Sequence, residues 1–288
     1  MELVVLSGKG GTGKTTIATA LSELINDVTR VDCDVDASNF YLFYKGKNIE
    51  ESSFVGGKKA KINEDLCKQC NKCELVCKFS AIKNHKIDPF LCEGCGACKL
   101  VCPCEAIELT DEKTADVFLS KVDQGIIYQG IISRAEMEIG SDGSGKLISQ
   151  LRKNASLAKD NDSFTIIDGS PGIGCPVISS ITGSDAVLVV TEPTKSGIKD
   201  LTRVVELCNY FDIFTMACIN KYDINEDVAI EIEEYLKSEN INLVGKIPYD
   251  NMVVKSINEL KPITKYDDSL AKKAIEDMLN NIKKIIKI

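Results

Sequence analysis

The feature that most constrains the fold lies at the start of the chain, where residues 4–16 read VVLSGKGGTGKTT. An apolar run typical of a buried strand leads into a glycine-rich loop, and the loop leads into a stretch with apolar residues at helical spacing. The pattern from Gly8 to Thr15 fits a P-loop, whose backbone N–H groups converge on phosphate at a helix N-terminus. It predicts an α/β fold built around a nucleotide site.

Two side chains of this loop have clear expected roles. Lys14 is expected to neutralise the β- and γ-phosphate oxygens, and the Thr15 hydroxyl to ligate Mg²⁺. A plain glycine-rich turn is the alternative, and the strand before the loop and the helix after it argue against that alternative. The other loop positions expected to bind the nucleotide are Gly8, Gly10, Gly11, Thr12, Gly13 and Thr16.

The rest of the chain continues the alternation of strand and helix. Compact apolar runs rich in β-branched residues lie at 2–6, 28–32, 164–168, 185–191, 214–220 and 242–248. Helix-like stretches lie at 14–26, 146–159, 196–210, 226–238, 250–259 and 267–287. This alternation predicts a doubly wound, mainly parallel sheet.

Acidic residues follow two of the expected strands. Asp168 ends the run at 164–168, the position where an acid holds Mg²⁺, usually through a water. The segment after it, 169–174, is suited to present backbone N–H groups to a γ-phosphate and to change conformation when that phosphate leaves. Among the acids of 32–36 (DCDVD), we expect Asp34 to be the catalytic residue that positions water. A solvated acidic turn is the alternative for any one of these residues.

One segment breaks the alternation because it is internally duplicated. Residues 62–83 and 87–108 match at a constant offset of 25, and the four cysteines, the preceding Leu and the following Ala-Ile all repeat. The duplication contains nine of the thirteen cysteines. The simplest organisation is a P-loop domain formed by residues 1–57 and 111–288, interrupted by a small α+β module at 58–110.

Each repeat carries the run Cys-x2-Cys-x2-Cys-x3-Cys, the spacing of bacterial two-cluster ferredoxins, in which the fourth cysteine ligates the other cluster. Zinc is the alternative metal, but the third and fourth cysteines of each run suit a cubane better than separate tetrahedral sites. One 4Fe–4S cluster is therefore expected on Cys67, Cys70, Cys73 and Cys102, and the other on Cys92, Cys95, Cys98 and Cys77.

Five cysteines lie outside these two runs. Cys104 follows a ligand position closely and is expected to be a spare thiol, with an alternative ligand as the other interpretation. Cys208 and Cys218 fall in helix and strand patterns and are expected in the core. Cys33 and Cys175 lie in the segments that follow the strands ending at Asp32 and Asp168, and packing is the expected role for both.

Composition narrows the function classes. The net charge of −8 makes non-specific binding to nucleic acid or anionic membrane an unlikely property of the whole protein, and the single His leaves little room for His-based metal sites. No signal-like segment and no apolar run long enough to cross a membrane is present in the sequence. We therefore expect a cytoplasmic protein whose cysteines are thiolates, most of them bound to metal.

The octapeptide KGGTGKTT resembles the deviant Walker A motif of the MinD, ParA, Mrp and nitrogenase-iron-protein superfamily, and the likeness extends to 31–39, 166–176, 190–201 and 247–250. The resemblance implies a homodimer formed on ATP binding, in which Lys9 contacts the nucleotide of the partner subunit. It also implies that Asn220 contacts adenine and that the segment after Pro248 closes over the base. Residues 220–223 (NKYD) also look like the guanine-reading motif of GTPases, so GTP stays open as an alternative.

The resemblance extends to two further features. The nitrogenase iron protein bridges a cluster between subunits near its switch segments, which makes a dimer-spanning site at Cys33 and Cys175 the alternative to packing. MinD proteins bind membrane through a C-terminal amphipathic helix like that of 275–288 here; a helix packed on the sheet is the favoured interpretation.

Taken together, the motifs resemble MinD-superfamily ATPases with an inserted ferredoxin domain. The first function this implies is a Mg²⁺-dependent ATPase whose dimer cycle drives electron transfer, or iron–sulfur cluster delivery, to a protein partner. The alternative is a MinD/ParA-like positioning or assembly switch whose clusters are structural or redox-sensing.

Overall fold

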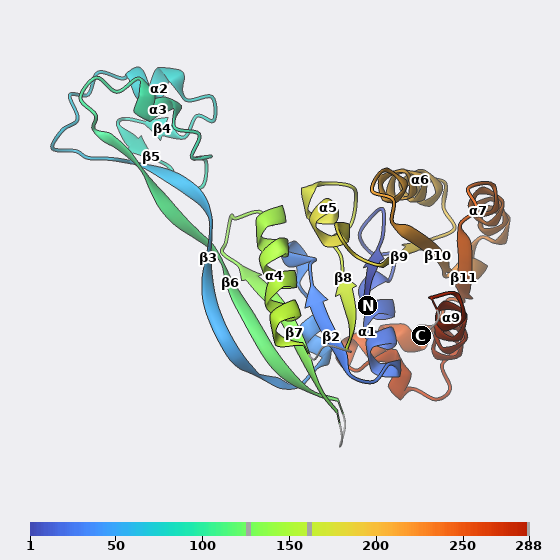
Figure 1. Ribbon diagram of the computed structural model, residues 1–288. Helices are drawn as coiled ribbons and strands as arrows, with labels where there is room; N and C mark the ends of the chain where they lie inside the picture. The colour runs from blue at the N-terminus through green and yellow to red at the C-terminus, as the bar shows by residue number, and fades with distance from the viewer. Residues whose placement is uncertain (125–127, 160–162, 287–288) are drawn as a thin grey trace. The chain divides into compact units, whose positions relative to one another are not determined.

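A computed structural model describes residues 1–124, 128–159 and 163–286 (Figure 1). The chain divides into two compact units. Unit 1 consists of Met1–Glu51, Val117–Glu136 and Gly143–Ile288, and unit 2 consists of Ser52–Asp116 and Met137–Asp142.

In the described part of the chain, the main sheet has nine strands in the order β11-β10-β9-β1-β8-β2-β7-β6-β3. The strands from β11 to β7 pair in parallel, which confirms the predicted mainly parallel sheet. Their bounds are β1 (Glu2–Leu6), β2 (Val28–Asp32), β7 (Tyr128–Met137), β8 (Phe164–Asp168), β9 (Ala186–Thr191), β10 (Phe214–Asn220) and β11 (Asn242–Ile247).

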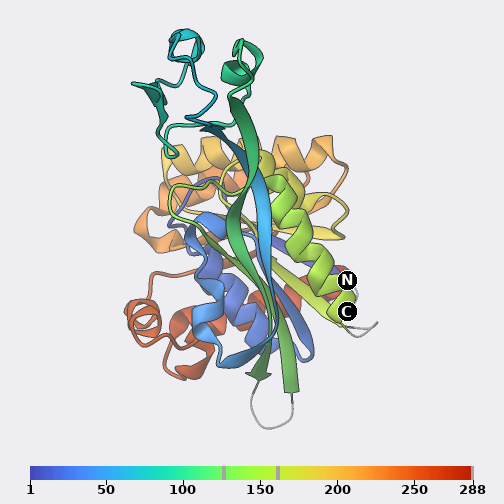
Figure 2. The ribbon, with the colours of Figure 1, turned by 90° about the vertical axis from the view of Figure 1, so that its left-hand side faces the viewer.

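Helices cover both faces of this sheet (Figures 1 and 2). Helix α1 packs against α9 on one face, and α4 packs against α5 on the other, where α6 and α7 also lie. The helices are α1 (Lys14–Leu24), α4 (Gly145–Ala158), α5 (Cys175–Ile181), α6 (Lys195–Tyr210), α7 (Glu226–Ser238), α8 (Asn251–Asn258) and α9 (Leu270–Ile286). Short 3-10 turns lie at Val35–Ala37, Phe40–Phe43, Tyr222–Ile224 and Ile263–Lys265.

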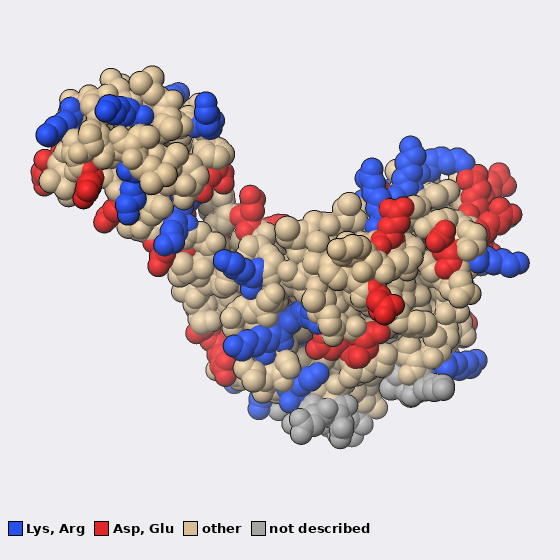
Figure 3. Space-filling model, turned by 45° about the horizontal axis from the view of Figure 1, so that its top comes forward, with Lys and Arg blue, Asp and Glu red and all other residues tan. Residues whose placement is uncertain are grey.

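The faces of β1 show why these sequences form a two-sided sheet. Successive strand residues point to opposite faces, and Leu3, Val4, Val5 and Leu6 are all fully buried. Leu3 and Val5 join the cluster built with α1 and α9, so Val4 and Leu6 face the helices of the other side. By contrast, the acidic residues of α7 gather on the surface, as expected for a solvated face (Figure 3).

The C-terminal helix α9 is part of the core. Its residues Ile275, Met278 and Ile282 are at most 1% exposed and pack in the cluster with β11 and α1. Gly245 of β11 makes room for this contact, because an added Cβ would meet Met278. The favoured interpretation of this helix as packed on the sheet is thus confirmed. Within the described residues, no helix is long and apolar enough to span a bilayer.

Unit 2 contains the cysteine repeats. Its helices α2 (Lys72–Val76) and α3 (Ala97–Leu100) begin 25 residues apart, and β4 (Ile82–Lys83) pairs antiparallel with β5 (Lys86–Ile87). The buried cluster of this unit is small and consists of Ala60, Cys73, Ala81, Ile82, Cys92, Cys98 and Ile107. Because so little apolar surface is buried, the unit is expected to need stabilisation beyond its hydrophobic core.

Three long strands were not expected from the sequence. Strands β3 (Gly46–Ile62) and β6 (Ile107–Gln124) continue across residues 57 and 110, where the sequence suggested domain boundaries, and β7 joins them in the sheet. The residues of β3 are mostly exposed and polar, so this strand lacks the compact apolar run by which the others were recognised. Helix α5 was also missed, since it has only seven residues.

The packing of α9 generates a stability prediction. Replacing fully buried Ile282 with Ala should lower the free energy of unfolding by about 2–4 kcal/mol, because a cavity forms between α9 and the sheet. Leu270→Ala, on the exposed side of the same helix, should cost less than about 1 kcal/mol. Denaturant unfolding measures both values. A neutral Ile282→Ala, together with vesicle binding by the wild type, would mean that α9 leaves the core.

Candidate functional site

The glycine-rich loop connects β1 to α1 in the geometry of a P-loop. Gly11 and Gly13 have φ angles of 82° and 91°, in the left-handed region that glycine adopts most readily. Gly13 has a second reason to lack a side chain, because a Cβ there would collide with the Asn220 amide. The absence of a side chain at Gly13 thus lets the Asn220 amide lie against the loop just before α1 begins.

Lys14 is buried at the start of α1 and is paired with two carboxylates. Its Nζ lies 2.6 Å from Asp168 Oδ1 and 3.1 Å from Asp34 Oδ2. Burial alone would lower the pKa of Lys14, but the charges of Asp168 and Asp34 more than offset it, so the pKa is raised. The Thr15 hydroxyl donates to the other Asp168 oxygen at 2.6 Å. The residues expected to act on phosphate and Mg²⁺ therefore form one connected group.

The sheet explains how these acids meet. Strands β2 and β8 are parallel neighbours, and Asp32 is in register with Asp168 at their carboxyl ends. Carboxyl ends of parallel strands line one edge of the sheet, which is where such folds bind ligands. Asp34 lies two residues beyond Asp32, within reach of Lys14.

Asp32 organises the segment that carries Asp34. Its carboxylate accepts hydrogen bonds from the Ser38 hydroxyl at 2.7 Å, from Phe40 N–H at 3.1 Å and from Asp34 N–H at 3.2 Å. Burial, with the nearby Asp168 charge, raises the pKa of Asp32 to about 7. Burial also raises the pKa of Asp34, although Lys14 opposes that effect. In the sequence, Asp32 was only one of the acids of 32–36 and had no separate predicted role.

The segments after Asp32 and Asp168 are joined directly. Cys33 N–H donates to the Asp168 carbonyl at 2.8 Å, and the Ser170 hydroxyl donates to the Cys33 carbonyl at 2.6 Å. The Cys33 thiol is fully buried, which raises its pKa, whereas Cys175 is exposed at the start of α5. These two hydrogen bonds tie the segment after Asp32 to the segment after Asp168.

Lys9 lies away from the Lys14 group and is paired with a different acid. Its Nζ lies 3.6 Å from Glu192 Oε2, while Lys221 Nζ contacts Glu192 Oε1 at 2.6 Å. Glu192 directly follows β9, a parallel neighbour of β1. Glu192 was not predicted: the sequence shows only that it follows a predicted strand, and its nearness to Lys9 depends on β9 lying beside β1.

A cavity of about 190 Å³ adjoins the P-loop at Gly11 and Gly13. Its lining contains the two residues predicted to contact the base, Asn220 and Pro248. Asn220 Nδ2 also donates to the Thr12 carbonyl at 2.7 Å, which ties β10 to the loop. Asp223 is not in this lining; its Oδ1 accepts from Tyr249 N–H at 2.7 Å. In this structure Asp223 fixes the chain after Pro248 and does not face the cavity.

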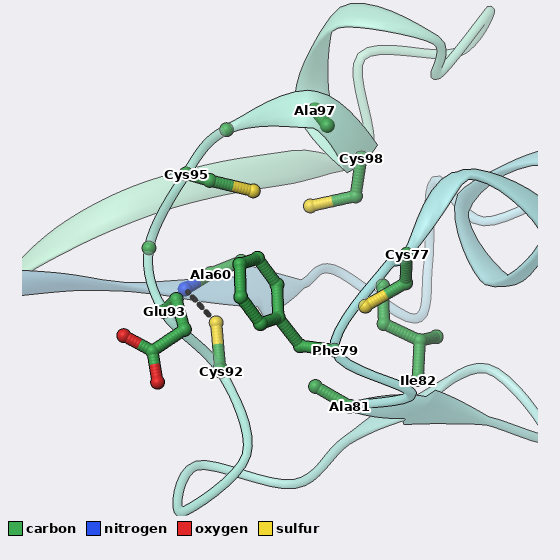
Figure 4. Close-up of a pocket in the computed structure, with 12 residues that line it drawn as sticks. Ala60, Cys77, Phe79, Ala81, Ile82, Cys92, Glu93, Cys95, Ala97 and Cys98 are labelled. Carbon is green, nitrogen blue, oxygen red and sulfur yellow. Dashed lines mark hydrogen bonds between the residues drawn. The ribbon is translucent and has the colours of Figure 1, made fainter.

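The cysteines of unit 2 surround two small cavities. Cys67, Cys70, Cys73 and Cys102 line what we call the first cavity, and Cys92, Cys95, Cys98 and Cys77 line the second. Each cavity thus combines three cysteines of one repeat with the fourth of the other. Figure 4 shows the sulfurs of the second cavity directed toward a common space, with the Phe79 ring among them.

The donor chemistry of these cavities fits iron–sulfur clusters. Backbone N–H groups donate to cysteine sulfur in both, from Ala60 to Cys92 at 3.5 Å and from Ala106 to Cys102 at 3.3 Å. Such hydrogen bonds favour the thiolate form that ligates metal. Among the described residues, no three His, Cys, Asp or Glu side chains converge closely enough to hold a single metal ion. Four thiolates on a cluster bind four different irons and do not need to converge on one ion.

The parallel sheet, the P-loop and the acids at the strand ends define a P-loop nucleotide-binding protein. The family model described as CobQ/CobB/MinD/ParA nucleotide binding domain matches residues 3–263, and the chain belongs to this family. The MinD/ParA part of the expected resemblance is thereby confirmed.

Individual relatives agree with this assignment. An uncharacterized protein of Methanocaldococcus jannaschii is 36% identical, covering 99% of this chain and 98% of that protein. An uncharacterized ATP-binding protein of the same organism is 27% identical, covering 98% of both. The structure of the septum site-determining protein MinD from Pyrococcus horikoshii, complexed with Mg-ADP, has a TM-score of 0.58 at 16% identity and covers 99% of this chain and 98% of its own.

The raised pKa of Asp32 predicts a pH effect on the nucleotide-free protein. A carboxyl whose folded pKa lies above its unfolded value of about 3.9 stabilises the fold at low pH and loses that contribution as pH rises through about 7. Between pH 5 and 8 the loss should be on the order of 2–3 kcal/mol, and Asp32→Asn should abolish it.

Chemical denaturation of both proteins across this pH range measures the slope, independently of any uniform destabilisation by the substitution. Asp27→Asn, exposed just before β2, is the matched control and should keep the wild-type slope. Equal slopes in the wild type and Asp32→Asn would contradict the assignment.

The position of Asp223 predicts how the site treats guanine. Asp223→Ala should leave the ratio of ATP to GTP affinity unchanged within about twofold, because this carboxylate bonds to the Tyr249 backbone and does not line the cavity. Asn220→Ala should weaken both nucleotides by roughly 1 kcal/mol, or about fivefold, because it frees the loop carbonyl of Thr12. Calorimetric titration with each nucleotide distinguishes these effects. A selective loss of GTP in Asp223→Ala would show that Asp223 reads guanine.

Proposed function

We propose that this chain is an ATP-hydrolysing switch of the MinD/ParA type, which dimerises on binding MgATP. The observation that carries the proposal is the single ion-paired group of Lys14, Asp34 and Asp168 at the P-loop, next to a cavity of base-binding size. Family membership supports the same function. Family membership favours the positioning or assembly switch over ATP-driven electron transfer, the other function expected from the sequence.

The contacts indicate how nucleotide binding would act on the chain. The phosphate oxygens of a bound nucleotide would compete with Asp168 and Asp34 for the Lys14 ammonium group. Thr15 and Asp168 would hold Mg²⁺, which would supply further positive charge at the site. Loss of its pairing to Lys14 leaves Asp34 available to orient a water for attack on the γ-phosphate. Because Cys33 and Ser170 link the two acid-bearing segments, this exchange moves both together.

Lys9 supplies the link to dimerisation. In the single chain it is held by Glu192, which it shares with Lys221. We propose that Lys9 leaves this pair when two chains close and contacts the phosphates bound to the partner subunit. Its one-third exposed side chain is accessible for such a rearrangement, and the second cation keeps Glu192 paired afterwards.

We further propose that unit 2 holds two 4Fe–4S clusters. The cross-repeat lining of each cavity, the N–H donors to sulfur and the very small apolar core support this assignment. The clusters would then be structural or redox-sensing parts of the switch. Electron transfer or cluster delivery to a partner is the second candidate function, favoured by the presence of two thiolate cavities in one unit.

The trans role of Lys9 is the sharpest test of the proposed switch. Lys9→Ala should lower the rate of MgATP hydrolysis by at least about a hundredfold, because a cation at the transferring phosphate is lost, while the affinity for ATP changes little. Lys195→Ala removes an exposed lysine paired with Glu231 and should leave hydrolysis unchanged. Phosphate release and equilibrium nucleotide binding are the measurements. A wild-type rate in Lys9→Ala would overturn the switch mechanism.

A further inference from the structure

The two cysteine cavities are related position by position. The 25-residue offset that relates the repeats maps Cys77 of the second cavity onto Cys102 of the first, and both residues line their cavities together with the Ala and Ile that follow. Among the residues of this stretch that line a cavity, only one pair differs in chemistry. Phe79 lines the second cavity, and its counterpart in the first cavity is Cys104.

The backbone explains why both side chains reach their cavities. Ser80 N–H donates to the Cys77 carbonyl and Glu105 N–H to the Cys102 carbonyl, so each fourth cysteine begins an equivalent four-residue turn. The turns end in the left-handed region, with φ angles of 54° at Ser80 and 51° at Glu105. Cys104 therefore faces the first cavity for the same reason that Phe79 faces the second.

The first cavity consequently has five thiols in its lining, one more than a 4Fe–4S cluster needs. Cys102 and Cys104 are both half-buried, and a single residue separates them in the same turn. The second cavity has an aromatic ring where the fifth thiol would be, and a phenyl ring has no donor atom for iron (Figure 4).

We infer that Cys104 is a reserve ligand of the first cavity and exchanges with Cys102 at one iron. The inference rests on the proposed iron–sulfur clusters of unit 2. In the exchange, Cys104 loses its thiol proton and binds iron, while Cys102 leaves the same iron and takes up a proton. No electron is transferred, and the total charge of the site is unchanged. The first cavity can thus change a ligand without losing its cluster, and the second cannot.

Iron content of the full-length chain tests this inference. The wild type and four variants are reconstituted anaerobically with ferrous iron and sulfide: Cys102→Ala, Cys77→Ala, Cys104→Ala and Cys102→Ala with Cys104→Ala. The wild type should hold about eight irons, as expected for two 4Fe–4S clusters. Cys104→Ala and Cys102→Ala should retain about eight, the latter with an altered EPR spectrum of the reduced protein.

Cys77→Ala is the matched control, because the duplication gives it the same position without a reserve thiol. It should fall toward about four irons, as should the double variant. MgATP binding and a thermal melt of each preparation check that the chain is folded. Iron loss in Cys102→Ala equal to that in Cys77→Ala would overturn the inference alone. A wild type that binds no iron would remove the proposed clusters and this inference with them.

Discussion

The ion pair between Lys14 and Asp168 is the interaction on which the rest of the nucleotide site depends. Both side chains are buried, and a buried charge is tolerated only when it is paired and hydrogen-bonded. Removing Lys14 would leave the Asp168 charge uncompensated beside Asp34, and removing Asp168 would leave Lys14 paired with Asp34 alone. The pair also fixes Thr15, because Asp168 accepts from its hydroxyl. Lys14 is therefore not an unpaired P-loop lysine, because its positive charge is already paired with carboxylates of the same chain.

This arrangement makes ligand binding an exchange of partners. Lys14 faces Asp32, Asp34 and Asp168 within one buried group, so carboxylates outnumber the cation. The excess of negative charge, together with burial, accounts for the raised pKa of Asp32. A divalent cation bound there would offset the excess. The same group anchors the segments after β2 and β8, which is how a change at the phosphates would extend to the surface of unit 1.

Much of unit 1 was predictable because its signals are local. The P-loop, the parallel strands and the amphipathic helices each follow from short patterns, and the structure confirms them within a few residues. The exposed strand β3 was not predictable in this way, because a polar strand carries no compact apolar run. The pairing of Lys9 with Glu192 was also out of reach, since it joins residues far apart in the sequence and depends on the order of β1 and β9. Asp223 illustrates a related point: the local motif NKYD resembles a guanine-reading sequence, and in the folded chain the Asp223 carboxylate accepts a hydrogen bond from Tyr249 N–H.

The two units differ in the composition of the buried clusters that stabilise them. Unit 1 buries a large apolar core on both faces of its sheet, whereas the buried cluster of unit 2 is nearly half cysteine. Binding of the proposed clusters to unit 2 is therefore expected to be coupled to its folding, as it is in small metal-binding domains. The duplication also leaves the two cavities unequal, because a thiol of one repeat corresponds to a phenyl ring of the other.

The proposed switch requires that MgATP convert this chain from a monomer into a dimer. Light scattering during size-exclusion chromatography of the anaerobically purified full-length protein tests it most directly. We expect a mass near the 31.5 kDa of one chain without nucleotide or with MgADP, and about twice that value with MgATP under conditions that prevent hydrolysis. A mass that stays the same in saturating MgATP would rule out a dimer formed on ATP binding.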